Sequence, residues 1–214
     1  MGFRSLRVLN DDRVAPGKGF GAHGHRDMEI ISYVMEGRLA HKDSTGQQEV
    51  LEPNMAQAMS AGTGVIHSEF NGSREQPVHF LQIWIVPAVE DVEPAYQQFA
   101  YDPEEKRGRL RLIAGPDKNP RDAAAFIQPA AFIHPAAFIH QDARMYASVL
   151  GAGETIEQAI AAGRHAWVHC ALGNIVLNGH ELKEGDGAAV SEENALSIAG
   201  AGTGGGEVLV FDLA

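Results

Sequence analysis

Residues 23–37, HGHRDMEIISYVMEG, join an H-x-H motif to a run of apolar, mostly β-branched or aromatic residues that ends at a glycine. The run at 30–35 has the composition and length of a buried strand, and Gly37 marks the turn that follows it. His23 and His25 are two positions apart, so on an extended chain both imidazoles project from the same face. This stretch therefore predicts a β-structure that carries a pair of metal-ligand candidates.

The same punctuation by turn residues continues along the chain. Further short β-rich runs lie at 78–86, 145–150, 166–170, 174–178 and 207–213. Only two segments, 92–99 and 154–162, are candidates for short helices. Many short strands with few helical periods between them are typical of β-sandwiches and barrels. We expect an all-β protein.

The two halves of the chain echo each other faintly. Each contains a strand that ends in glycine (Gly37 and Gly173), then a hairpin, and each contains the tetrapeptide AGTG, at 61–64 and 201–204. We interpret this as two tandem jelly-roll β-barrel domains, at 1–112 and 142–214, joined by a linker at 113–141. The linker holds a hexapeptide repeat at 124–141: AAFIQP, AAFIHP, AAFIHQ. Because His134 and His140 recur with the repeat, they are not counted as ligands.

Composition excludes several classes of protein. The 214 residues carry 28 acidic and 17 basic side chains, a formal charge of −11, with no run of Lys or Arg. That balance argues against nucleic-acid and anionic-membrane partners. Cys170 is the single cysteine, so the chain has no internal disulfide and no cysteine-based metal cluster. No signal peptide or apolar span is recognisable, and we expect a cytoplasmic protein.

A second ligand pair follows the first. His67-Ser68-Glu69 repeats the i, i+2 geometry with a carboxylate in place of one imidazole. Two such strands facing each other in a barrel would place three nitrogens and one oxygen around one point. Imidazole and carboxylate together suit a first-row transition metal, and four protein ligands leave two positions open on a six-coordinate ion. Nothing in the spacing selects the metal.

The other histidines have simpler interpretations. His41 lies in a hairpin and is expected to be solvated, whereas His79 lies on a strand face and is expected to be a hydrogen-bonded core residue. Counting back from Gly173, as His25 and His23 stand to Gly37, reaches Ala161 and Ala159. The second barrel therefore lacks the metal pair.

Four motifs in order, HGHRDMEIISYVMEG, HKDSTG, MSAGTGVIHSEFN and LQIWIVP, closely resemble the pirin family of bicupins, nearest to its branch with quercetin 2,3-dioxygenase activity. The resemblance continues to VLVFDL at 208–213. It implies two tandem cupin domains with one metal in the N-terminal domain, held by His23, His25, His67 and Glu69. In the broader cupin superfamily Glu29 would fill a ligand position; here we expect it behind the ligands.

The resemblance implies a metal-dependent dioxygenase, with Glu69 as the catalytic residue, that opens the heterocyclic ring of a flavonol such as quercetin with O2 and releases carbon monoxide. The expected metal is Fe(II), with Ni, Mn, Co, Cu or Zn as alternatives, and the expected state is a monomer. The alternative is a non-enzymatic metal- or redox-sensing interaction module. Relatives carry further residues before the position of Met1, so we expect N-terminal strands to be missing from the first domain.

Overall fold

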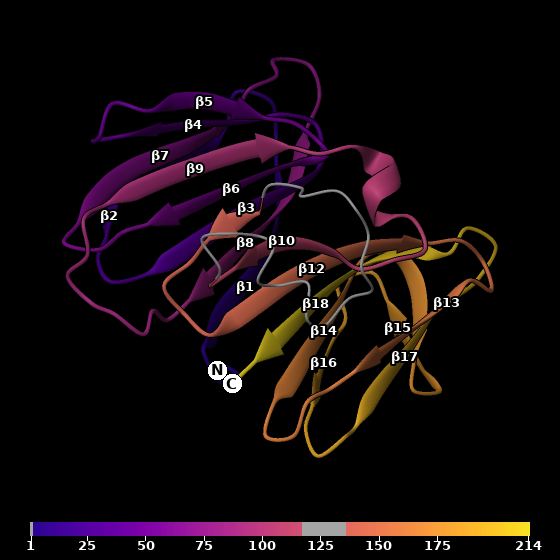
Figure 1. The fold of residues 1–214 in the computed structure, drawn as a ribbon. Helices are drawn as coiled ribbons and strands as arrows, with labels where there is room; N and C mark the ends of the chain where they lie inside the picture. The colour runs from indigo at the N-terminus through magenta and orange to yellow at the C-terminus, as the bar shows by residue number, and fades with distance from the viewer. Residues whose placement is uncertain (1, 117–135) are drawn as a thin grey trace. The chain divides into compact units, whose positions relative to one another are not determined.

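The computed structural model describes residues 2–116 and 136–214. Its contacts divide the chain into two compact units: Met1–Tyr101 with Pro116–Gln141, and Asp102–Gly115 with Asp142–Ala214. Strands make up nearly all the regular structure of the described residues, and one 3-10 turn, η1 (Pro103–Lys106), is the helical element (Figure 1). The all-β expectation is confirmed. No helix in the described ranges is long and apolar enough to cross a membrane.

Two sheets build the first unit. One has the order β1-β8-β3-β6-β9 and the other the order β2-β7-β4-β5. Their strands are β1 (Leu6–Val14), β2 (Gly19–His25), β3 (Glu29–Glu36), β4 (Leu39–Asp43), β5 (Gln48–Leu51), β6 (Met55–Ser60), β7 (Val65–Asn71), β8 (Val78–Ile85) and β9 (Ala95–Ala100). A two-residue strand, β11 (Ala137–Phe138), also belongs to this unit.

The core between these two sheets is apolar at both ends and polar in the middle. One apolar cluster contains Val34, Leu39, Leu51, Val78 and Phe80, and the other contains Ile30, Met59, Ala61 and Val65. Between them the inward side chains include Ser32, Gln57, Gln82, His41 and Glu69, all buried. Burial of so many polar groups is costly unless they bond to one another. This polar layer is where a functional site is expected.

The second unit has the strands β10 (Arg111–Gly115), β12 (Ala143–Leu150), β13 (Thr155–Ala159), β14 (His165–Leu177), β15 (His180–Lys183), β16 (Gly187–Val190), β17 (Ala195–Gly200) and β18 (Gly206–Leu213). Its strand order is β10-β12-β18-β14-β17-β13, with β15 and β16 also paired to β14. The long β14 joins both halves of this barrel because a register shift between Cys170 and Leu172 bends it.

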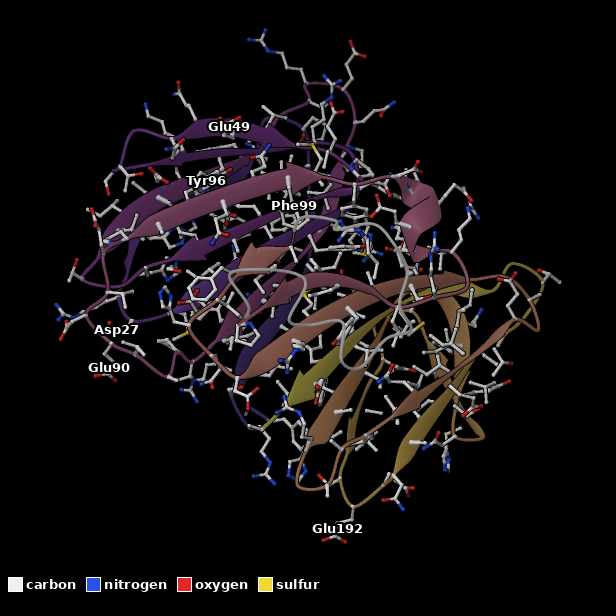
Figure 2. The ribbon with its side chains drawn as sticks, in the orientation of Figure 1. Asp27, Glu49, Glu90, Tyr96, Phe99 and Glu192 are labelled. Atoms are coloured by element: carbon white, nitrogen blue, oxygen red, sulfur yellow. The ribbon has the colours of Figure 1, made fainter. Side chains whose placement is uncertain are left out.

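Both predicted helices are wrong. Residues 95–100, which overlap the first candidate, form β9, which pairs with β6 at the edge of the sheet, and Figure 2 marks Tyr96 and Phe99 on this strand. Residues 155–159, within the second, form β13, which pairs with β17 over its whole length. Both segments contain good helix formers, but pairing with a neighbouring strand outweighs a local preference of tenths of a kcal/mol per residue.

Parts of the predicted linker, residues 113–141, belong to the folded units. Its start, at 113–115, lies within β10, which pairs with β12. The first two hexapeptide copies, 124–129 and 130–135, lie outside the described residues. The third copy, 136–141, is described: Ala137 and Ile139 are buried, and the backbone of Phe138 bonds to the side chain of Gln97. This copy is therefore part of the packed first unit.

Candidate metal centre

The two predicted ligand pairs lie on neighbouring antiparallel strands. In the pairing of β2 with β7, His23 is opposite His67 and His25 is opposite Val65. Burial alternates along β7, with His67 and Glu69 buried and the residues between them more exposed. The period of two thus turns both ligand candidates of β7 inward, as the sequence predicts.

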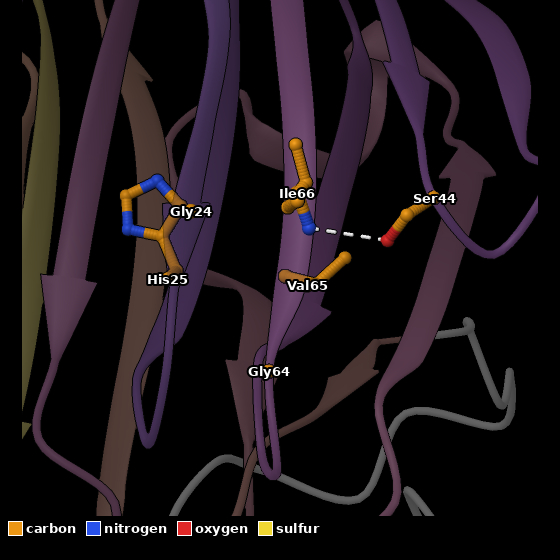
Figure 3. Close-up of a pocket in the computed structure, with 6 residues that line it drawn as sticks. All are labelled: Gly24, His25, Ser44, Gly64, Val65 and Ile66. Carbon is orange, nitrogen blue, oxygen red and sulfur yellow. Dashed lines mark hydrogen bonds between the residues drawn. The ribbon is translucent and has the colours of Figure 1, made fainter.

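A shallow depression of about 370 Å³ opens beside His25, where β2 ends and β7 begins (Figure 3). It is lined by Gly24, His25, Ser44, Gly64, Val65 and Ile66. Glycines at two of these positions leave backbone rather than side chains at the surface. One imidazole of the histidine group therefore borders a space that a small molecule can enter.

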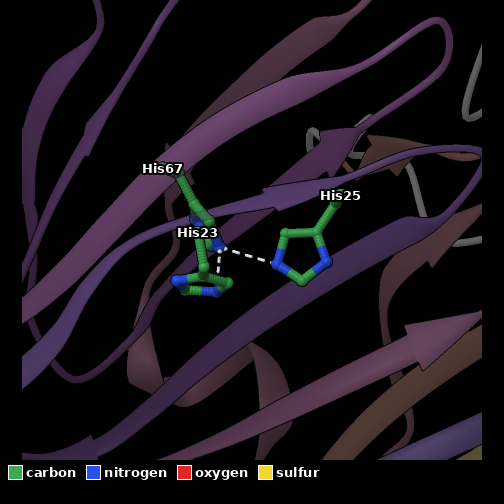
Figure 4. A group of neighbouring side chains, drawn as sticks. All are labelled: His23, His25 and His67. Atoms are coloured by element: carbon green, nitrogen blue, oxygen red, sulfur yellow. Dashed lines mark hydrogen bonds between the residues drawn. The ribbon is translucent and has the colours of Figure 1, made fainter.

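Three imidazoles converge on one point (Figure 4). The Nε2 atom of His67 lies 2.9 Å from Nε2 of His25 and 3.0 Å from Nε2 of His23. Two nitrogens bound at right angles to one ion, with bonds of about 2.1 Å, lie about 3.0 Å apart. Hydrogen bonds would need a proton between each pair of nitrogens, whereas one cation satisfies all three lone pairs. The donor set fits a transition metal.

The protonation states favour the same interpretation. Burial, followed by the charge of His23, lowers the pKa of His25 to about 4. Burial, followed by the neighbouring histidines, lowers the pKa of His67 to about 3. Nδ1 of His23 lies 2.8 Å from the carbonyl oxygen of Gly21 and donates a hydrogen bond to it, which directs Nε2 toward the other two histidines. At neutral pH His25 and His67 are therefore neutral, and each can present a nitrogen lone pair to a metal ion.

Glu69 lies one pleat along β7 from His67. Its carboxylate accepts hydrogen bonds from Ser32 Oγ, at 3.1 Å, and from Gln82 Nε2. Burial raises its pKa to about 7 against the opposing effect of these two bonds. Potential ligand atoms of Glu69, His67 and His41 lie within 4.8 Å of one another, in a second group that shares His67 with the first. The carboxylate therefore stands beside the three-histidine cluster, and its role as a ligand stays a prediction.

Glu29 faces the other way. The residue opposite it on β6 is Ser60, whereas the adjacent Ile30 packs in the core with Val65 and Trp84. Glu29 accepts a hydrogen bond from Ser60 Oγ at 2.7 Å, and its other oxygen lies 3.0 Å from Nδ1 of His140. The expectation that Glu29 stands behind the metal ligands is wrong, because a strand sends successive side chains to opposite faces.

His41 is not solvated, contrary to the sequence interpretation. Its side chain is buried, with Nε2 3.1 Å from Asp43 Oδ2 and its ring 5.4 Å from that of His67. Alternation was the missed signal: in β4, His41 and Asp43 are two apart and pair with Glu69 and His67 of β7. For His79 the expectation is confirmed, since it is buried with Nε2 2.7 Å from Asp11 Oδ1.

No group of three metal-ligand candidates occurs in the second unit among the residues that the structure describes. The sequence comparison placed Ala159 and Ala161 at the positions of His23 and His25. In the structure β13 is the equivalent of β2, and Gln158 is the residue opposite Leu196 of β17, as His23 is opposite His67. Gln158 and Leu196 do not offer the nitrogen ligands of a transition-metal site. Within the described residues, the candidate metal site therefore lies in the first unit.

Comparison with known proteins agrees with this geometry. A family model described as Pirin matches residues 1–85, and one described as quercetinase C-terminal cupin domain matches residues 134–213. The chain is 39% identical over 213 residues to quercetin 2,3-dioxygenase from Escherichia coli K12, covering 100% of this chain and 84% of that protein. The chain belongs to the pirin family. Both the predicted resemblance and the tandem cupin fold are confirmed.

Solved pirin structures extend the comparison. The crystal structure of the bacterial pirin YhhW from Escherichia coli in complex with nickel(II) has a TM-score of 0.85 and 38% identity, covering 100% of this chain and 84% of that one. A putative quercetin 2,3-dioxygenase from Pseudomonas aeruginosa, PA1210, is 38% identical over 193 residues, which is 90% of this pirin and 77% of that relative. This pirin therefore resembles a relative that binds a divalent transition metal.

Proposed function

We propose that this pirin is a metal-dependent dioxygenase that opens the heterocyclic ring of a flavonol such as quercetin. The observation that carries the proposal is the convergence of three imidazoles, with Nε2 atoms 2.9 and 3.0 Å apart, beside a buried carboxylate. The relatives named quercetin 2,3-dioxygenase support the choice of substrate. In this reaction O2 is the oxidant, both its atoms enter the ring-opened product, and C3 of the flavonol leaves as carbon monoxide.

His23, His25 and His67 would hold the metal, with Glu69 as the carboxylate ligand. Fe(II) is the proposed ion, and nickel(II) is the first alternative because a relative was crystallised with it. When bound, a divalent ion of this kind supplies Lewis acidity to the flavonol 3-hydroxyl group and a means of electron transfer to O2. Three histidines and one carboxylate suit either ion.

Glu69 is the proposed proton acceptor. Its pKa of about 7 means that a modest change in surroundings converts it between carboxylate and acid at neutral pH. Ser32 and Gln82 donate to both of its oxygens, which fixes the plane of the carboxyl group. The depression beside His25 gives a planar substrate a route of approach. We infer a cytoplasmic monomer without a nucleic-acid partner.

Aerobic turnover of quercetin tests this function. Protein is reconstituted separately with Fe(II) and with Ni(II). The active form should bleach the flavonol and release one carbon monoxide for each flavonol consumed. His67→Ala should abolish both signals, since it removes the nitrogen shared by both short contacts. His79→Gln is the matched control: this buried histidine of β8 pairs with Asp11 of β1, outside the cluster, so its loss should leave turnover intact.

The second candidate is a non-enzymatic, metal-dependent interaction module. The outward face of the sheet that carries the histidines exposes large apolar side chains: Val50 (46%), Ile66 (56%) and Phe70 (43%). Such a surface is typical of proteins that bind other proteins. Folded, metal-loaded protein that leaves quercetin and O2 unconsumed would contradict the dioxygenase and favour this candidate.

A further inference from the structure

A row of polar side chains crosses the five-stranded sheet of the first unit at the level of Glu69. Ser32 of β3 lies between Gln82 of β8 and Gln57 of β6 in the strand register. All three are buried, between the two apolar clusters described above. Gln57 turns to His41, with Nε2 3.3 Å from its Nδ1, while Ser32 and Gln82 turn to Glu69. The two glutamines therefore serve different partners.

The amide of Gln82 is held at both ends. Its Nε2 donates to the carboxylate of Glu69, and its Oε1 accepts a hydrogen bond from the indole Nε1 of Trp84 at 3.1 Å. Trp84 is two residues further along β8, so the two side chains share the inward face. An indole N–H only donates and a carboxylate only accepts. Of the two orientations of the amide, only the observed one satisfies both neighbours.

Trp84 also contacts the histidine cluster directly. Its ring lies edge-on to that of His25, with centroids 5.0 Å apart and an interplanar angle of 82°. One side chain thus packs against a proposed ligand of β2 and, through Gln82, fixes the proposed ligand of β7. The four groups form a continuous chain: His25, Trp84, Gln82 and Glu69.

We propose that Trp84 and Gln82 are positioning residues that orient His25 and Glu69 for metal binding. The inference concerns metal binding, so it rests on the proposed function only where it predicts an effect on turnover. Trp84 sets the direction of the Gln82 amide, and Gln82 holds the carboxylate plane. Partners behind metal ligands typically contribute 10–100-fold to metal affinity.

The test compares four variants of the full chain. Gln82→Met removes the donor to Glu69 at similar volume, and Gln82→Glu replaces that donor with a second acceptor. Trp84→Phe keeps a ring against His25 but removes the N–H. Gln57→Met is the matched control, an identical change of a buried glutamine in the same row that serves His41 instead. The probes are Co(II), followed by its d–d absorption spectrum, and Ni(II), followed by calorimetric titration.

We expect Gln82→Met to weaken Ni(II) binding about 10–100-fold and to shift the Co(II) spectrum. Gln82→Glu should weaken binding at least as much, and Trp84→Phe less, since the amide can still donate in one of its two orientations. Gln57→Met should leave the Ni(II) affinity within about twofold of the parent and the Co(II) spectrum unshifted. Thermal melting of the metal-free variants establishes that each is folded at the assay temperature.

Two results would overturn the proposal: Gln82→Met with parental affinity and spectrum, or Gln57→Met with the same losses as Gln82→Met. The second would show that any buried glutamine of this row acts by general packing. Failure of the dioxygenase is a separate result. If the parent does not consume quercetin, but Gln82→Met still shifts the Co(II) spectrum while Gln57→Met does not, the positioning role stands and the flavonol activity falls.

Discussion

The two cupin barrels of this pirin share a pattern of strand pairing but differ in what lines their interiors, which is polar in the first barrel and aliphatic at the equivalent positions of the second. The pairs β1–β8, β2–β7, β3–β8 and β4–β5 of the first barrel correspond to β12–β18, β13–β17, β14–β18 and β14–β15 of the second. The single strand β14 does the work of β3 and β4 together. A common topology therefore tolerates both an interior with a cluster of metal-ligand candidates and one that has no such cluster among its described residues.

Gly37 and Gly173 align the two barrels residue by residue. Both have positive φ, of 78° and 71°, and a Cβ at either would collide with a carbonyl oxygen of the strand connection beside it, Pro77 in one barrel and Gly205 in the other. Only glycine combines that backbone conformation with so close an approach. These two positions are the shared fixed points of the fold.

Four residues beyond each glycine the interiors diverge. His41 faces Glu69 across β4 and β7, whereas Leu177 faces Ile198 across β14 and β17. One pleat away, His67 of the first barrel corresponds to Leu196 of the second. The comparison teaches that aliphatic residues suffice to close this barrel. The buried histidines and carboxylate are thus not needed to close the barrel, and burying them costs stability in the metal-free protein.

The strongest way to break this contrast is to give the first barrel the second barrel's residue. His67→Leu should lower Ni(II) affinity by more than about 100-fold, because a direct ligand contributes more than the partners behind it. Calorimetric titration measures the loss, and Leu196→Met in the second barrel serves as the control. Affinity within tenfold of the parent would remove His67 from the metal site.

The reverse change, Leu196→His, should destabilise the protein by about 2–4 kcal/mol, since it buries an imidazole among aliphatic neighbours. Urea unfolding measures the cost. Because Gln158 is the side chain opposite, no second metal should bind. A second equivalent of Ni(II) in the titration would show that the second barrel is closer to a metal site than its sequence indicates.

Acid should weaken the metal-free protein through the first barrel. The folded state holds His67 and His25 at pKa values of about 3 and 4, below their ordinary value of 6.5, so the unfolded chain binds protons first as the pH falls. Glu69 opposes this effect, because burial raises its pKa to about 7 and the folded state takes up that proton first. The net loss of stability between about pH 6.5 and pH 4 should be roughly 2 kcal/mol. Urea unfolding across this range should show a shallower dependence for His67→Leu, and an unchanged slope would contradict the assignment.

The smallest effects test the shared framework. Gly37→Ala and Gly173→Ala should each cost about 1–3 kcal/mol, by similar amounts, because each forces a Cβ into a backbone contact at positive φ. Gly46→Ala is the control: its φ is also positive, at 98°, but no atom lies within 4 Å of the added Cβ, so its cost should be smaller. Markedly unequal costs in the two barrels would break the alignment.

The two AGTG tetrapeptides do not occupy equivalent positions, although the tandem domains that they suggested are present. The tetrapeptide AGTG precedes β7 in the first barrel, where Gly62 packs against the backbone of Val92, but it lies between β17 and β18 in the second. The two copies are not equivalent. Topology alone separates them, because a short glycine-rich string fits many turns.

A strand's period of two is a local property that places i, i+2 residues on one face. The residues alone therefore predict the all-β class, the two barrels and the convergence of His23, His25 and His67. The sequence left undecided the strand identity of 95–100 and 155–159, and its interpretation misplaced His41 and Glu29. Only the tertiary structure decided these, together with the bonds from Gln82 and Ser32 to Glu69. Register between strands distant in sequence brings such partners together, and that register is set by the packing of the whole barrel.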